Sequence, residues 1–270
     1  MSSRKWLIAV SILALTLPIM AQGEAPQVDD LIAKNIEARG GKAKIQAVKT
    51  MRMTMQVSGA PFEIKITQEA KRPNSFRQDV ALQGQVMSTG YDGKQGWKIN
   101  PFEGYGGKKE AQVMTPDELK QAEVESDMDG SLVDYKLKGH KVEYMGKEAV
   151  EGSDAYKLKV TLKNGDINYV FLDGETFLEV KQTSKRKMND TEIEAETFYG
   201  DYKEVNGMLL PHAIETGAAG MPQRQKIAIE KIEFDVAVAD SQFAKPAPPP
   251  PAPAVAPTPT PAPAPKPDKN

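Results

Sequence analysis

The sequence predicts an α+β fold that is mostly antiparallel β: one large, strongly curved sheet of about ten or eleven strands with helices on one face. Three observations predict it. Apolar residues recur at helical spacing near residue 30, they alternate with polar residues through two long later regions, and a capped helix separates those regions. Helices therefore do not alternate with strands, which argues against a parallel, doubly wound sheet.

Three helices are expected. The first has apolar residues at three- and four-residue steps, namely Val28, Leu31, Ile32 and Ile36. Gly40-Gly41 supplies its C-terminal cap, and a short helical piece follows over residues 42–48. Thr115 and Glu118 form a capping box with Pro116 at the first helical position, which begins a third helix over 116–128. Its inner side carries Leu119, Ala122 and, as a further candidate, Val124.

Strands are predicted where the apolar period changes from 3.6 to 2. The first region has the apolar series Met51, Met53, Met55, Val57, then Phe62, Ile64, Ile66, then Phe76, Val80, Leu82. The second region has Tyr156, Leu158, Val160 and Leu162. Asn164-Gly165 is a two-residue hairpin signal, and so is Asp92-Gly93 in the glycine-rich stretch 90–107. That stretch matches no phosphate-binding motif, so we interpret it as a hairpin between strands 85–91 and 96–99.

The two ends of the chain differ from the middle in composition. Residues 1–21 have the basic start, apolar middle and small-residue exit of a secretory signal, with cleavage after Ala21 or, alternatively, after Gly23 or Ala25. The other interpretation of this run is an uncleaved anchor. Residues 246–270 hold twelve of the 20 prolines and predict a solvated polyproline-II tail, either a spacer or an end without a partner. The folded domain is then 22–245.

Composition excludes several classes of protein. The chain has no Cys, so it has no disulfide and no thiol for lipid attachment behind the signal. Of its 35 basic residues two lie in the signal, which leaves 33 against 37 acidic residues. That balance argues against a nucleic-acid partner, because phosphate binding needs a basic face. The exported chain is expected to be periplasmic.

Catalytic and metal-binding patterns are not found. The two histidines, His140 and His212, lack the spacing of a zinc site, and no serine-nucleophile motif occurs. The segment 125–136 resembles a calcium loop, but Lys136 stands where a bidentate Glu is needed. The series Glu192, Glu194 and Glu196 is interpreted as a solvated face paired with lysines such as Lys157 and Lys159. We expect no enzyme activity, no cofactor and no metal.

Surplus apolar strand faces remain. A single sheet this large cannot bury one face on itself, so helices or a ligand must cover it. Methionines are frequent there, with Met87 and Met114 following the first series, and thioether side chains repack readily around flexible acyl chains. An ordinary methionine-containing core is the alternative. The candidates to line an apolar cavity are Met51, Met53, Met55, Phe62, Ile64, Ile66, Phe76, Val80, Trp97 and Leu119.

Two motifs resemble the LolA family of periplasmic lipoprotein carriers. Lys71-Arg72-Pro73-Asn74 is followed by Asp92-Gly93-Lys94, Trp97 and Asn100-Pro101-Phe102, in the order of that family's K-R-P-N and D-G-K-x-x-W-x-x-N-P-F. The segment from Asp240 to Phe243 is similar to its closing D-x-x-F. The resemblance is specific over residues 50–105, where Gly96 replaces a bulky residue beside Trp97.

The resemblance implies an open half-barrel whose concave face is covered by helices over an apolar cavity. It implies a periplasmic carrier that takes lipoproteins, by their acyl chains, from an inner-membrane release transporter to an outer-membrane acceptor. Arg72 is the residue that would bond to the lid and hold it closed, and the carrier is expected to be a monomer. Alternatives are a lipid- or lipoprotein-sensing regulatory module of the same fold, and an unrecognised periplasmic hydrolase.

Overall fold

The computed structural model of the 270-residue chain describes residues 27–59, 62–102, 104, 107–188 and 191–247. The predicted signal peptide and all but the first two residues of the predicted tail lie outside the described residues. The helices are α1 (Val28–Ala38), α2 (Lys42–Ala47) and α3 (Pro116–Glu125), with a short 3-10 turn η2 (Asp240–Gln242) near the C-terminal end. All three predicted helices are confirmed, and the capping box at Thr115 and Glu118 is present.

One antiparallel sheet of thirteen strands dominates the fold, in the order β6-β5-β4-β3-β2-β1-β15-β14-β11-β10-β9-β8-β7. Its first half has β1 (Thr50–Ser58), β2 (Ile64–Lys71), β3 (Ser75–Leu82), β4 (Gln85–Tyr91), β5 (Gly96–Asn100) and β6 (Lys108–Val113). Its second half has β7 (Lys141–Val150), β8 (Ser153–Thr161), β9 (Ile167–Asp173), β10 (Glu179–Met188), β11 (Thr191–Gly200), β14 (Ala213–Ala218) and β15 (Gln225–Phe234). The strands β12 (Lys203–Val205) and β13 (Met208–Leu210) form a separate ribbon.

The predicted antiparallel, mostly β architecture is confirmed, but the predicted count of ten or eleven strands is too low. The edge strand β6, with sequence KKEAQV, was not expected because its residues are mostly polar and do not alternate. It forms because its backbone pairs with β5, where Trp97 lies opposite Val113. The hairpin at Asp92-Gly93 is confirmed, since β4 and β5 pair directly across it.

The register shows which side chains share a face of the sheet. Met55 lies opposite Ile66, Ile66 opposite Val80, and Val80 opposite Met87, so this apolar row runs across four strands on one face. Across β8 and β9, Leu158 lies opposite Val170 on that same face. We call it the inner face, and we call the opposite one the outer face.

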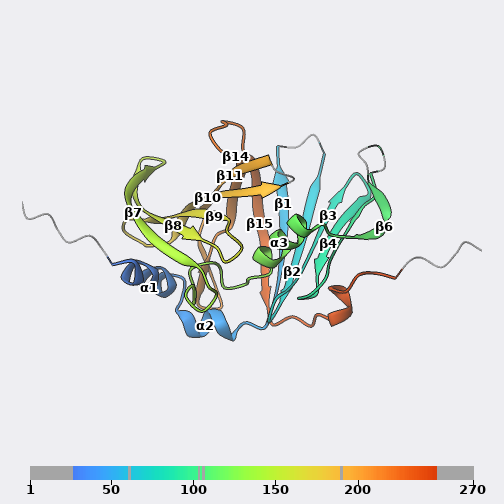
Figure 1. Ribbon diagram of the computed structural model, residues 1–270, viewed down its shortest axis with the longest axis horizontal. Coiled ribbons are helices and arrows are strands. Elements are labelled where there is room, and N and C mark those ends of the chain that lie inside the picture. Colours follow the sequence, from blue (N-terminus) through green and yellow to red (C-terminus); the bar gives the residue numbers. More distant parts are fainter. Residues whose placement is uncertain (1–26, 60–61, 103, 105–106, 189–190, 248–270) are drawn as a thin grey trace, which may run out of the picture.

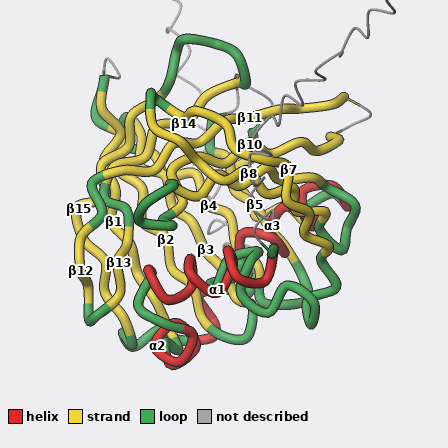
Figure 2. The backbone as a smooth tube through the Cα atoms, turned by 90° about the vertical axis from the view of Figure 1, so that its left-hand side faces the viewer, coloured by secondary structure: helices red, strands yellow, loops and turns green. Residues whose placement is uncertain are grey.

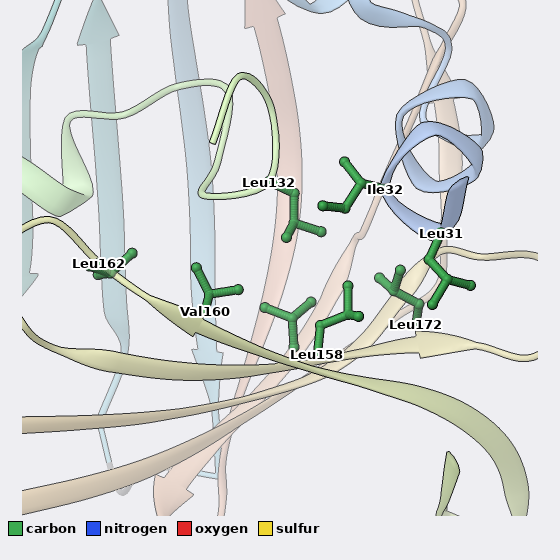
Figure 3. Close-up of a cluster of buried hydrophobic side chains, with 8 residues drawn as sticks. Leu31, Ile32, Leu132, Leu158, Val160, Leu162 and Leu172 are labelled. Atoms are coloured by element: carbon green, nitrogen blue, oxygen red, sulfur yellow. The ribbon is translucent and has the colours of Figure 1, made fainter. Parts of the chain in front are cut away.

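The three helices lie on the inner side of the sheet, which curves around α3 (Figure 1; Figure 2). Helix α1 packs on the second half, where Leu31 and Ile32 meet Leu158, Leu172 and Leu132 (Figure 3). Helix α2 contributes Ile45 to a cluster with Val133 and Met208. Helix α3 packs on the first half, as described below.

Candidate functional site

The inner face of the first half of the sheet has an apolar row that is only partly covered, next to a polar row of Gln68, Gln78 and Thr89. Met55 is 5% exposed, whereas its row neighbours Ile66 and Val80 are half-buried. The other half-buried apolar side chains of this face are Met51, Met53, Ile64, Leu82, Met87, Ile227 and Ile232. Side chains in a closed core of this size are normally buried, so this row is apolar and still reachable.

Helix α3 lies across this face and is held at both flanks. On the side of β5, Lys98 pairs with Glu118; on the side of β10, Arg186 donates to the side chain of Gln121. Beneath it, Leu119 and Ala122 pack against Phe76 and Tyr91. Helix α3 therefore crosses the inner face of the sheet from β5 to β10.

Gly96 explains how closely α3 approaches β5. A Cβ atom at this position would lie 2.4 Å from the sulfur of Met114 and 3.2 Å from a methyl carbon of Leu119. A side chain larger than hydrogen would require the side chains of Met114 and Leu119 to shift, since such contacts are closer than van der Waals distance. The residue that departs from the family pattern thus serves the packing of this helix.

Openings remain on both sides of α3. A cleft of about 850 Å³ lies between α3, the segment 126–140 and the inner face, where it reaches Tyr91, Asn168 and Gln182. A second pocket of about 370 Å³ lies where Arg186 and Gln121 meet the tip of the β8–β9 hairpin. Both are within the range of roughly 300–1,000 Å³ typical of ligand sites. A small cavity of about 40 Å³ lies under α2, between Met51, Met128 and Phe234.

Arg72 lies at the turn between β2 and β3 and forms hydrogen bonds with two segments, the end of α2 and the segment after α3. Its Nε donates to the carbonyl of Val48 (2.6 Å), and Nη2 donates to that of Ile45 (2.8 Å), both at the C-terminal end of α2. Its Nη1 and Nη2 also donate to the two carboxylate oxygens of Asp129, at 3.1 and 2.5 Å. This geometry matches the fork of a guanidinium, and it satisfies carbonyls that a helix end leaves without partners.

Asp129 was missed as a partner of Arg72, because its sequence context suggested only a calcium loop. Its side chain is 9% exposed, and Nη1 of Arg39 donates to its backbone carbonyl at 3.1 Å. Arg39 caps α1, so Asp129 joins the end of α1 and the segment after α3 to the Arg72 turn. No sequence spacing indicates this, since Arg72 and Asp129 are 57 residues apart.

The predicted cavity residues do not all lie together. Register and packing place Met51, Met53, Met55, Ile64, Ile66, Phe76 and Val80 on the inner face, with Leu119 on α3 above it. Phe62 precedes β2 and is 40% exposed. Val124, the further candidate on α3, is 37% exposed and lines the larger cleft.

Trp97 lies on the outer face, so it is not placed to line an inner cavity. Its neighbour Gly96 faces α3, and in a strand the next side chain points the other way. The indole is fully buried and its Nε1 donates to the carbonyl of Phe243 (2.7 Å). The C-terminal segment 236–245 thus packs across the outer face, where Arg77 also donates to the carbonyl of Gln242.

One carboxyl group inside the fold is unusual. Burial raises the pKa of Glu179 to about 7, although Arg39 acts in the opposite direction. Its Oε1 is shut off from solvent and has no hydrogen-bond partner within the described residues. The same burial, with Glu179 nearby, raises the pKa of Tyr199 and Tyr202. Glu179 lines none of the clefts above, so its geometry does not indicate a hydrolytic site.

The outer-face carboxylates of β11 pair with lysines, as predicted, but with different ones. Glu196 pairs with Lys181 (2.6 Å) and Glu194 with Lys185 (2.9 Å), both from the adjacent β10. Lys157 and Lys159, the expected partners, pair instead with glutamates of β7. The prediction failed on strand order, because Lys157 and Lys159 are on β8, which β9 and β10 separate from β11.

Over the described residues, no group of three or more potential metal-binding side chains occurs. In the same part of the chain, each helix is too short or too polar to cross a membrane.

Solved structures share this fold at low sequence identity. A LolA superfamily protein from Nitrosomonas europaea is 11% identical with a TM-score of 0.55, covering 82% of this chain and 99% of that one. A DUF1329 family protein from Desulfovibrio piger is 12% identical with a TM-score of 0.54, covering 80% and 97%. Neither the protein-family models nor the curated proteins contain a match to the sequence.

The structure defines a class of fold: one large open antiparallel sheet with helices on its inner side. Within that class, the similarity to the Nitrosomonas protein shows that this chain has a LolA-like fold, as its two motifs indicated. At this level of identity, the likeness establishes the fold alone.

Proposed function

We propose that the protein is a periplasmic carrier that binds the acyl chains of lipoproteins, or another apolar ligand, for transfer toward the outer membrane. The observation that carries this proposal is the row of half-buried apolar side chains on the inner face of the first half of the sheet. A ligand would cover them. The LolA-like fold supports this function by analogy, and the signal-like start supports the location.

The chemistry of the face suits an acyl chain. Each methylene taken from water contributes about 0.8 kcal/mol, so about eight buried methylenes contribute roughly 6 kcal/mol before the costs of association. Four inner-face methionines, Met51, Met53, Met55 and Met87, can repack around chains of different length. No directional polar contact is needed for this part of the ligand.

The other components follow from the same proposal. The mature domain would be 22–245, a monomer that exchanges its cargo with an inner-membrane release transporter and an outer-membrane acceptor. It would bind no nucleic acid and need no cofactor. Arg72 would hold α2 and the segment around Asp129 in the closed position, and release of this contact would open the cavity.

A binding assay tests the proposal. We expect the mature protein to enhance the emission of a fluorescent fatty-acyl probe at one site per chain, with displacement by a lipopeptide. Met53→Glu should abolish binding, because it places a charge on the inner face; Lys65→Glu, on the outer face, is the matched control. Truncation after Lys245 should leave binding intact. Absence of probe enhancement at micromolar protein would refute the proposal.

A sensor module of the same fold is the second candidate. It is favoured by the convergence of Arg72 and Arg39 on Asp129, since such a junction lets a ligand on the inner face alter surface segments around α1 and α2. A carrier exchanges cargo with membranes, whereas a sensor holds a signalling protein. Transfer of the bound probe to lipid vesicles, measured by energy transfer, distinguishes the two.

A further inference from the structure

The inner face has a polar strip on β9 and β10. On β9 and β10 the side chains that share the face of Val170 are Asn168, Gln182 and Ser184, because Gln182 lies opposite Val170 and Ser184 opposite Asn168. Arg186 follows two residues further along β10 on this face. The inner face therefore carries a polar strip from Asn168 to Arg186, next to the apolar Val170 and Leu172 that pack against α1.

These polar groups are largely without partners in the protein. Over the described part of the chain, the side chains of Asn168, Gln182 and Ser184 make no hydrogen bond, although Asn168 is only 6% exposed. Arg186 uses one nitrogen to donate to Gln121, while its Nε is buried and unpartnered. Buried donors in proteins are almost always satisfied, so a ligand or water is expected beside the Nε of Arg186.

The charges around Arg186 are mixed, since Asp117, Asp166 and Glu192 line the same pocket as Lys120, Lys185 and Lys187. Lys120 pairs with Asp117 (3.5 Å) and Lys185 with Glu194 (2.9 Å), so these cations are already matched. Arg186 has no carboxylate within 4.0 Å among the described residues, and its only polar partner is the neutral Gln121. Gln121 in turn donates to Glu125 (2.6 Å), which is the nearest acid in this network.

The two openings beside α3 give access to the strip. The larger cleft reaches Asn168 and Gln182, and the smaller pocket reaches Arg186. Both are lined by Lys120 and Asn164, so they adjoin at the rim of the sheet. The larger cleft also reaches the apolar groups of Tyr91, Val124 and Leu162, so a ligand can place an apolar part beside α3 and a polar part at this rim.

We propose that the ligand is an amphiphile with an anionic head group, which Arg186 binds at the rim while the acyl chain lies on the apolar row of the inner face. This inference rests on the proposed function and names the class of its ligand. A planar guanidinium can offer parallel N–H donors to carboxylate or phosphate oxygens, and Gln182 and Asn168 supply further donors along the strip.

The experiment compares head groups on one acyl chain. Palmitate and palmitoyl-glycerol phosphate are the anionic probes, and monopalmitoylglycerol is the neutral one, each titrated below its aggregation concentration by calorimetry. We expect both anionic probes to bind about tenfold or more tighter than the neutral one, which corresponds to one charge-assisted contact. The preferred anionic probe distinguishes a carboxylate site from a phosphate site.

Variants assign the difference to Arg186. Arg186→Gln should remove the preference for anionic probes and leave the neutral probe unchanged. Glu125→Gln should strengthen anionic binding, because it removes a negative charge that acts on Arg186; this second variant keeps the test decisive if Arg186→Gln unfolds. Lys231→Gln, with the same change of net charge on the exposed outer face, should alter neither probe.

Three results would overturn the inference. Equal affinity of anionic and neutral probes for the parent protein refutes the head-group site and leaves the proposed function standing, with water as the partner of the strip. Displacement of palmitate by millimolar inorganic phosphate alone, without loss of the neutral probe, would mean an anion site independent of lipid. Binding of no acyl compound refutes the proposed function and this inference with it.

Discussion

Replacement of Arg72 by Leu removes four hydrogen bonds at once. Two go to the carbonyls of Ile45 and Val48, and two go to the carboxylate of Asp129, whose side chain is 9% exposed. Breaking a buried ion pair costs about 3–5 kcal/mol, because the remaining charge stays desolvated. The side chain of Arg72 is itself 26% exposed, so we expect the lower end, about 3 kcal/mol.

A loss of about 3 kcal/mol changes the equilibrium between closed and open α2 by about 100-fold. The amides around Ile45 and Ser126, which bond to Gly41 and Ala122, should then exchange with deuterium about 100-fold faster. Amides of β8 and β9 should keep their protection, since the α1 cluster that covers these strands does not include Arg72. Hydrogen exchange followed by mass spectrometry measures both regions in one experiment.

Two further variants resolve the contribution of each contact. Arg72→Lys should be intermediate, because an ammonium cannot bridge Asp129 and two carbonyls together. Asp129→Asn should be milder than Arg72→Leu, because the two carbonyl bonds remain. The matched control is Arg77→Leu, which has a similar exposure of 28% but bonds to the C-terminal segment. Unchanged exchange around α2 in Arg72→Leu would refute the reasoning.

Other predictions concern the rest of the molecule. In the parent protein the pKa of Glu179 is about 7 when folded, above its unfolded value, so stability falls by up to about 3 kcal/mol as pH rises from about 4.5 to 7. Glu179→Gln should remove this part of the pH dependence. Urea unfolding at several pH values measures it. Phe243→Ala should lower stability by about 3–5 kcal/mol in the same assay yet leave acyl-probe affinity unchanged, because this ring is buried on the outer face. Gly96→Val should loosen α3, seen as faster exchange over residues 119–122, because its Cβ would meet Met114; parental exchange there would contradict this.

The sequence predicted those parts of the fold that local patterns control. The capping box of α3, the hairpin at Asp92-Gly93 and the row of inner-face methionines each depend on neighbours within a few residues. The polar edge strand β6 was missed because backbone pairing, not side-chain pattern, holds it. Strand order was also beyond reach, which is why the lysine partners of the β11 glutamates were assigned to the wrong strand.

The candidate site was predictable only in part. Alternation located the apolar residues, but alternation cannot say which face a helix or the C-terminal segment covers, and Trp97 was therefore assigned to the wrong side. Asp129 and Arg186 act through contacts 57 and 65 residues away in the chain. Such pairs depend on how the two halves of the sheet and the segments between them pack in three dimensions. Local sequence spacing does not contain that information.

Methionine methyl groups offer the most direct test of whether an acyl chain occupies the inner face. With [¹³C]methyl-methionine protein, addition of a spin-labelled stearate should broaden the resonances of Met53, Met55 and Met87, which share that face. The resonances of Met145 and Met221, which are 51% and 55% exposed elsewhere, should keep their widths. Broadening of the second set without the first would contradict the account, because the chain would then bind outside the hollow of the sheet.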